Sequence, residues 1–232
     1  MIKMVVFDMA GTTVNEDNIV YKTVQKAIND AGFNVTLDQV LEEGAGKEKL
    51  QAIKSVLKTF AGNEDEQLAD NIFQKFRVLL TNAYDTAEIL PQNNAAELFS
   101  ALKKRSIIVI LNTGYNAATA TSLITKLGWQ KGVDFDGLIT ASDVANGRPD
   151  PAMILLAMQQ FGIQYPKEVI KIGDSVIDIE EGQNAGCVLN IGITTGAHTP
   201  EQLKSANPDY IIDNLVELLP IIDKMSSFPR NM

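Results

Sequence analysis

Short apolar runs alternate with amphipathic stretches over most of this chain, and the alternation predicts its main elements. Ile2–Phe7 is a largely apolar run, long enough for one buried strand and too short for a helix. Similar runs predict strands over 107–111, 138–140, 169–172, 188–191 and 210–212. Amphipathic stretches predict helices over 94–104, 116–127, 151–161, 176–185, 200–205 and 215–225. Repeated strand–helix units with apolar strands indicate an α/β fold, with a parallel sheet covered on both faces.

The stretch over about 15–87 interrupts this pattern, because its apolar residues recur at helical spacing only. Helices are expected over 19–31, 37–43, 47–60 and 64–84. Asn18 and Thr36 can cap the first two, and Gly44-Ala45-Gly46 forms a flexible break before the third. The sequence therefore predicts a sheet domain formed by residues 1–14 and 88–232, with an all-helical domain, 15–87, inserted after the first strand.

Polar side chains follow several of the predicted strands where they end. Asp8 comes directly after the first strand, and Thr113 and Asp174 each follow a later strand by two residues. Asp178 lies four residues beyond Asp174, and Arg148 stands just before a helix N-terminus. Each alone could be a turn or cap residue, but the carboxyl ends of parallel strands meet at one edge, where ligands bind. Two carboxylates suit a hard cation such as Mg²⁺, and a hydroxyl with a guanidinium suits phosphoryl oxygens.

Composition narrows the classes of partner. The 232 residues carry a formal net charge of −9, from 20 basic and 29 acidic residues. This balance disfavours nucleic acid or an anionic membrane as the main partner. Cys187 is the only cysteine, so no disulfide can form within the chain, and a cytoplasmic location is expected. No segment has the pattern of a signal peptide or the roughly 20 apolar residues of a membrane span.

Four short motifs occur in order at predicted strand–helix junctions: FDMAGT, NTG, GRPDP and GDSVID. With these motifs the whole chain resembles the haloacid dehalogenase superfamily of phosphohydrolases. The resemblance implies a Rossmann-like parallel-sheet core and a mobile helical cap, which corresponds to the inserted domain. It also implies a small phosphorylated or phosphonate metabolite as the substrate.

The resemblance further implies roles for the residues at the strand ends. Asp8 would be the nucleophile that forms an aspartyl-phosphate. Mg²⁺ would be held by the Asp8 carboxylate, the backbone carbonyl of Ala10 and Asp174, with Asp178 orienting its surroundings. A metal and a cation are needed because a dianionic phosphoryl group repels an attacking carboxylate.

The same resemblance implies how the phosphoryl group is bound. Thr113 would donate a hydrogen bond to it and Arg148 would neutralise it, so both are catalytic candidates. Thr12 and Gly114 are candidates for substrate binding. A cap that closes over these groups would exclude water and strengthen their electrostatic contacts.

Ala10 departs from the usual pattern of the superfamily. Most of its phosphatases carry a second aspartate two residues after the nucleophile, which protonates the leaving oxygen and later activates water. Alanine cannot transfer a proton, and general acid–base assistance is typically worth about 10²–10⁴ in rate. The residue therefore argues against an ordinary efficient phosphatase.

The phosphonoacetaldehyde hydrolase branch is similar to this chain at that position, since its first motif also reads D-x-A-G-T and its second includes TGY. Those enzymes form a Schiff base between a cap lysine and an aldehyde, so that the iminium accepts the electrons of the breaking carbon–phosphorus bond. The resemblance points to Lys47 in EGAGKEK as a catalytic and substrate-binding residue, although a solvated helix face explains it too. An alignment shifted by two selects Lys49. The branch's methionine and histidine near the lysine correspond to Glu43 and Leu50 here.

Three functions remain open at this point. The first is Mg²⁺-dependent, phosphonatase-like hydrolysis of a small metabolite through an aspartyl-phosphate. The second is a phosphate monoester phosphatase resembling phosphoglycolate phosphatase. The third is a catalytically weak phosphate-binding regulatory protein, for which Ala10 is the only support. A homodimer is possible through the apolar stripe over 19–28, which ordinary packing explains equally well.

Overall fold

The computed structural model describes residues 1–227 and contains one six-stranded parallel sheet in the order β5-β4-β1-β6-β7-β8. The strands are β1 (Met4–Asp8), β4 (Ile108–Thr113), β5 (Gly137–Thr140), β6 (Val169–Gly173), β7 (Leu189–Ile193) and β8 (Tyr210–Ile212). The central strand β1 is fully buried and lies between β4 and β6. The expected α/β fold class is therefore confirmed.

Side chains alternate in direction along each strand, so the apolar strands present apolar side chains on both faces of the sheet. Helices cover both of these faces. On one face, Val5 and Phe7 of β1 share a core with α5 (Ala95–Lys104), α6 (Ala117–Leu127) and α10 (Leu218–Ser227). On the other, Met4 and Val6 pack with α7 (Ala152–Gln160). The remaining helices of the sheet domain are α8 (Val176–Ala185) and α9 (Pro200–Ser205).

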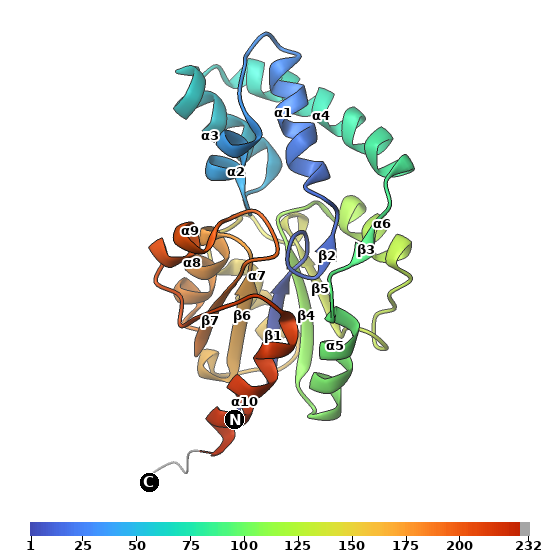
Figure 1. The fold of residues 1–232 in the computed structure, drawn as a ribbon, viewed down its shortest axis with the longest axis vertical. Coiled ribbons are helices and arrows are strands. Elements are labelled where there is room, and N and C mark those ends of the chain that lie inside the picture. The colour runs from blue at the N-terminus through green and yellow to red at the C-terminus, as the bar shows by residue number, and fades with distance from the viewer. Residues whose placement is uncertain (228–232) are drawn as a thin grey trace.

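Four helices between β1 and β4 lie together beyond the carboxyl ends of the core strands (Figure 1). They are α1 (Ile19–Asn29), α2 (Leu37–Gly44), α3 (Lys49–Ala61) and α4 (Glu66–Thr86). The chain enters and leaves them through β2 (Val14–Asn15) and β3 (Leu90–Pro91), which pair antiparallel. This arrangement holds the two linkers side by side. No helix within residues 1–227 is both long and apolar enough to cross a membrane.

The cap of α1 and the first residue of α3 differ from the sequence predictions. Thr36 caps α2 through a capping box, as expected, whereas Asn18 adopts a left-handed conformation (φ 55°) and its side chain caps nothing. Helix α3 begins at Lys49 instead of residue 47, because Gly46 (φ 74°) continues the turn and Glu48 becomes the N-cap. Lys47 therefore precedes the helix, and Lys49 occupies its first position.

Candidate active site

Three buried carboxylates meet where the central strands end. Asp8 closes β1, Asp174 directly follows the neighbouring β6, and Asp178 lies in the first turn of α8. One oxygen from each lies within 4.8 Å of the other two. The parallel register brings them together. Strands β1 and β6 pair up to Phe7 and Ile172, and both strands then end at the same edge of the sheet.

Arg148 connects these carboxylates. Its guanidinium nitrogens lie 2.7 Å from Asp8 Oδ1, 2.9 Å from Asp178 Oδ1 and 3.2 Å from Glu181 Oε2. Asn112, at the end of β4, accepts hydrogen bonds from the guanidinium through its side-chain oxygen and its carbonyl. The side chain of Arg148 is 1% exposed, so these ion pairs are shielded from solvent.

A second cation, Lys171 of β6, pairs with the carboxylates and was not expected from the sequence. Its Nζ is 3.0 Å from both Asp178 and Glu181, and its side chain is fully buried. Lys171 stands inside an apolar strand, which is an unusual place for a charge unless it is paired. Glu181 follows Asp178 by three residues, and this spacing places both on one helix face. The charge inside an apolar strand and the three-residue spacing of the two acids are the sequence features that could have indicated the buried pair of Lys171 and Glu181.

The cluster fits a divalent cation. Four carboxylates (Asp8, Asp174, Asp178 and Glu181) face two cationic side chains, so the fully ionised cluster has an excess of two negative charges. Burial raises the pKa of Asp8 to about 6, although Arg148 opposes this shift. Burial and the negative charge of Asp8 raise the pKa of Asp174 well above its usual range. Oxygen ligands with excess negative charge are what Mg²⁺ binds.

Backbone and small residues hold Asp174 in place. The amide of Ala197 donates to Oδ2 at 2.6 Å, and the Thr12 hydroxyl donates to Oδ1 at 3.2 Å. A Cβ at Gly11 or Gly196 would overlap with this carboxylate. The site therefore needs glycine at both positions, and Thr12 serves the carboxylate as well as lining the site.

The predicted phosphoryl-binding groups follow β4. Thr113 is the last residue of β4 and is buried, and its Oγ accepts a hydrogen bond from the amide of Tyr115. This bond leaves the hydroxyl proton free to be donated. Gly114 lies against the helical part, since a Cβ there would come within 2.9 Å of the Gly46 carbonyl oxygen. Thr113 and Gly114 thus lie where the two parts of the molecule meet.

The glycine loop before α3 enters the same place from the other side. A Cβ at Gly46 would overlap with Ile177 and come within 2.6 Å of Ser175 Oγ. The Gly46 amide donates to the Tyr21 hydroxyl at 3.0 Å. The loop therefore packs between the segments that carry Thr113 and Asp178, and it can do so only without side chains.

The structure does not bring Lys47 to the carboxylates. Its Nζ donates to Ser55 at 3.1 Å and lies 3.7 Å from Glu43, and its side chain is 27% exposed. Lys47 instead lines a cleft of about 470 Å³ together with Glu48, Gln51, Gly147, Arg148 and other residues of the two parts. Lys47 and Arg148 therefore line the same cleft.

Lys49 points inward. It is 6% exposed, and its Nζ lies 5.1 Å from the ring centroid of Tyr21 and 5.4 Å from that of Tyr115. Its Nζ donates a hydrogen bond of 2.6 Å to the Lys47 carbonyl oxygen. Burial lowers the pKa of Lys49 to about 8. The negative charge of Asp8 opposes this shift, and the positive charge of Arg148 adds to it. The positive end of α3 acts in the same direction.

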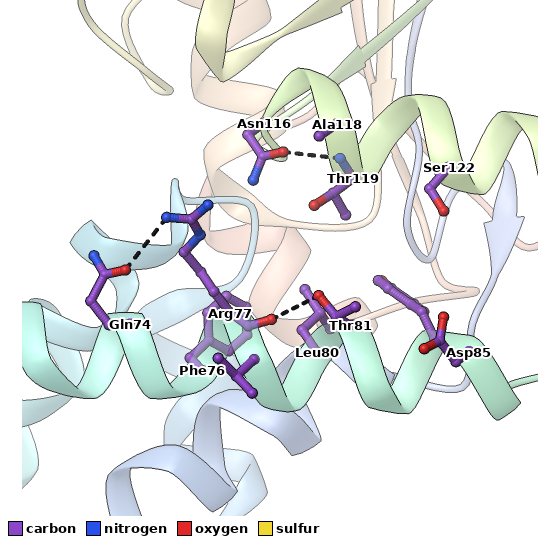
Figure 2. Close-up of a pocket in the computed structure, with 12 residues that line it drawn as sticks. Gln74, Phe76, Arg77, Leu80, Thr81, Asp85, Asn116, Ala118, Thr119 and Ser122 are labelled. Carbon is purple, nitrogen blue, oxygen red and sulfur yellow. Dashed lines mark hydrogen bonds between the residues drawn. The ribbon is translucent and has the colours of Figure 1, made fainter.

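His198 and a second cleft are two further polar features of the described chain. His198 accepts a hydrogen bond from the Val176 amide at Nδ1, and its Nε2 lies 3.2 Å from the Leu41 carbonyl oxygen. A second cleft, of about 440 Å³, lies between α4 and the start of α6, and Arg77, Asp85 and Asn116 are among its lining residues (Figure 2). The His198 amide donates to the Asp174 carbonyl oxygen at 3.2 Å, so this histidine lies next to the segment that carries the carboxylates. None of the predicted site residues lines the second cleft.

Comparisons with known proteins agree with this geometry. A family model described as haloacid dehalogenase-like hydrolase matches residues 2–186. The chain is 29% identical over 256 aligned residues to a phosphonoacetaldehyde hydrolase of Latilactobacillus sakei, with 96% of each chain covered. A phosphonoacetaldehyde hydrolase-like protein from Oleispira antarctica has a TM-score of 0.83 at 21% identity, covering 96% of this chain and 92% of that one. A "predicted phosphoglycolate phosphatase" from Haemophilus somnus has a TM-score of 0.77 at 22% identity, covering 95% and 98%. The two solved structures show the fold.

Proposed function

The chain belongs to the haloacid dehalogenase-like hydrolases, and from this premise we propose that it cleaves the carbon–phosphorus bond of a small phosphonate aldehyde. The observation that carries this proposal is Lys49, a buried amine with a lowered pKa facing the same site as Asp8. The similarity to phosphonoacetaldehyde hydrolase supports it. We take residues 15–87 as the cap that closes the site.

We propose Asp8 as the nucleophile. Its free oxygen would attack phosphorus while Arg148 neutralises the phosphoryl oxygens and the Thr113 hydroxyl donates to them. Asp8, the Ala10 carbonyl, Asp174 and Asp178 would hold Mg²⁺, in keeping with the excess negative charge of the cluster. When bound, the ion supplies positive charge that lets an anionic carboxylate approach an anionic substrate.

We propose Lys49, in place of Lys47, as the residue that forms the Schiff base. A lysine nucleophile must lose its proton, and burial beside Arg148 favours the neutral amine of Lys49. The amine would attack the aldehyde carbon, and the resulting iminium would accept the electron pair of the carbon–phosphorus bond as phosphorus passes to Asp8. No acid is then required at Ala10, because the leaving group is an enamine carbon and not an alkoxide. Lys47, which lines the 470 Å³ cleft together with Arg148, remains a candidate for binding the incoming anion.

The test is a comparison of two substrate classes. Phosphonoacetaldehyde and a panel of phosphate monoesters are offered to the wild type, Lys49→Ala and Lys47→Ala, with and without Mg²⁺. We expect Mg²⁺-dependent release of phosphate from phosphonoacetaldehyde, lost by a factor of about 10³ or more in Lys49→Ala and largely kept in Lys47→Ala. Ester turnover that survives Lys49→Ala would instead establish the phosphatase, and no turnover with phosphate still bound would leave the regulatory protein.

A further inference from the structure

Glu16 is a buried carboxylate that the proposed chemistry leaves unused. It lies directly after β2, where the chain enters the helical part, and it is 3% exposed. The Tyr84 hydroxyl donates to Oε2 at 2.5 Å, and the Tyr115 hydroxyl is a second hydrogen-bond partner. The two hydroxyl oxygens are 3.3 Å apart. The backbone amide of Val20, in α1, is a third partner. The hydrogen-bond partners of this carboxylate are therefore neutral groups from α1, α4 and the sheet domain.

Glu16 and Lys49 share the same buried surroundings. Tyr115 contacts both, since its hydroxyl bonds Glu16 and its ring lies under the Lys49 ammonium. The titratable groups that face this space are Tyr21 from α1, Lys49 from α3, Tyr84 from α4 and Tyr115 from the loop after β4. The three tyrosines stay neutral because burial raises their pKa values well above the usual range. Asp8 and Glu48 attract the Lys49 ammonium and Arg148 repels it from outside this cluster. Within the cluster itself, Glu16 and Lys49 are the two groups that can exchange a proton.

We propose that Glu16 is the proton partner of Lys49 in the closed site: its carboxylate takes the proton that Lys49 loses and returns it when water leaves. This inference rests on the imine-forming function proposed for Lys49. Because Glu16 takes the proton from Lys49 and later gives it to the oxygen of the addition product, it is a catalytic residue for imine formation. It supplies a proton-holding group in a site whose first motif has alanine where other members carry an acid.

The electrostatics of the cluster favour this exchange. Burial removes the hydration of a charged group, which costs free energy unless another charge or hydrogen bonds compensate. The pKa values of Glu16 and Lys49 therefore both shift in the direction that favours the neutral form. Burial raises the pKa of Glu16 to about 7, against the hydrogen bonds of Tyr84 and Tyr115. Burial lowers the pKa of Lys49 to about 8. With the two values this close, the ion pair and the neutral acid–amine pair have similar free energies in the closed site.

The proton transfers balance through the sequence. An N–H bond of the Lys49 ammonium breaks and an O–H bond forms on Glu16, leaving a free amine. The amine adds to the aldehyde carbon, and the proton on nitrogen moves to the former carbonyl oxygen to give a neutral carbinolamine. Glu16 then protonates this hydroxyl, the carbon–oxygen bond breaks, and water leaves an iminium on Lys49. The carboxylate is regenerated for the next turnover.

Tyr84 connects this cluster with solvent. It lines the 440 Å³ cleft between α4 and α6 while its hydroxyl bonds Glu16 (Figure 2 shows the cleft). The Lys126 ammonium donates to the Tyr84 carbonyl oxygen, which fastens this end of α4 to α6. Glu16 can therefore exchange its proton with bulk water through Tyr84 while the catalytic side of the site stays closed.

The experiment measures how fast borohydride traps an imine with phosphonoacetaldehyde, as a function of pH. We expect the wild-type rate to follow an ionisation near pH 7. In Glu16→Gln, which keeps the size but cannot hold the proton, the rate at pH 7 should fall at least about tenfold and this ionisation should disappear. In Tyr84→Phe the carboxylate loses a donor that stabilises its charge, so the ionisation should move to higher pH. Glu88→Gln, in the second linker, is the matched control and should match the wild type.

Two outcomes separate this inference from the function on which it rests. Wild-type trapping that is unchanged in Glu16→Gln overturns the role of Glu16 alone, whereas no trapping in the wild type at any pH overturns the imine chemistry. Difference infrared spectroscopy of the Glu16 carboxyl, without substrate, gives an independent measurement. A midpoint near 7 supports the inference, and one near the ordinary value of about 4.3 overturns it. If Glu16→Gln fails to fold, Glu16→Asp replaces it and should keep the ionisation at a reduced rate.

Discussion

Gly46 of the helical part packs directly against Ile177 of the sheet domain, with no room for a Cβ between them. The same loop covers Gly114, so one glycine-rich segment contacts both of the chain segments that carry candidate phosphoryl and metal ligands. Lys49 follows this loop by three residues and is positioned by it. The packing of the helical part against the sheet domain and the position of Lys49 therefore depend on the same loop.

Gly46→Ala should hold the site open. The added methyl overlaps with Ile177, and an L-residue at φ 74° adds about 1 kcal/mol of strain. We expect kcat/KM to fall about tenfold to a hundredfold, with the fold intact by circular dichroism. Gly62→Ala is the control, because Gly62 has a similar φ of 60° and no atom within 4 Å of its would-be Cβ. Equal losses in the two variants would mean that strain, and not closure, explains the effect.

Metal binding and pH should be coupled through Asp8. Its pKa is raised from 3.8 to about 6, so between pH 4 and 6 the folded protein holds a proton that the unfolded chain has released. The metal-free protein consequently loses stability as pH rises through this window, and Mg²⁺ must displace the proton in order to bind.

The measurement of this coupling is the rise in Tm caused by Mg²⁺. Saturation to about 100 times Kd stabilises the fold by about 2.7 kcal/mol, or roughly 5–10 °C for a chain of this size. At pH 5 the apparent affinity should be about tenfold weaker than at pH 8, with a correspondingly smaller rise in Tm. Asp8→Asn should reduce this pH dependence but not abolish it, because the pKa of Asp174 is also raised. An identical Mg²⁺ effect at both pH values would contradict the assignment.

Ala10 gives a test of the leaving-group argument. Ala10→Asp restores a proton donor two residues after the nucleophile, and general acid assistance is worth about 10²–10⁴ in rate. We expect turnover of phosphate monoesters to rise by a factor in that range, measured as phosphate release at saturating Mg²⁺. Ala10→Asn, which has nearly the same shape and no acidic proton, is the control. No gain in the aspartate variant would show that the missing acid is not what limits ester hydrolysis.

The residues that follow strands were predictable because the order of motifs along the chain determines which strand ends meet. Asp8, Asp174 and Asp178 lie together as expected, and Arg148 joins them from the GRPDP loop. Their catalytic and metal-binding roles remain proposals, but their positions follow from β1, β4 and β6 being neighbours in a parallel sheet.

The lysines were harder to assign because their environment depends on packing between distant segments. Lys47 and Lys49 differ by two residues, and only the turn at Gly46 decides which of them enters the protein. Glu16 is acidic in a polar linker sequence and is buried only because Tyr84 and Tyr115 close over it. Lys171 could have been found, since a charge within an apolar strand indicates a buried partner.

The central claim is that Lys49 forms an imine with an aldehyde substrate, and peptide mapping after trapping tests it most directly. The wild-type protein is incubated with phosphonoacetaldehyde and borohydride, digested, and analysed by tandem mass spectrometry, with Lys49→Arg as the control that keeps the charge. We predict one reduced adduct, located on Lys49 and absent from Lys49→Arg. An adduct on Lys47, or phosphate release from the aldehyde with no adduct on any lysine, would contradict it.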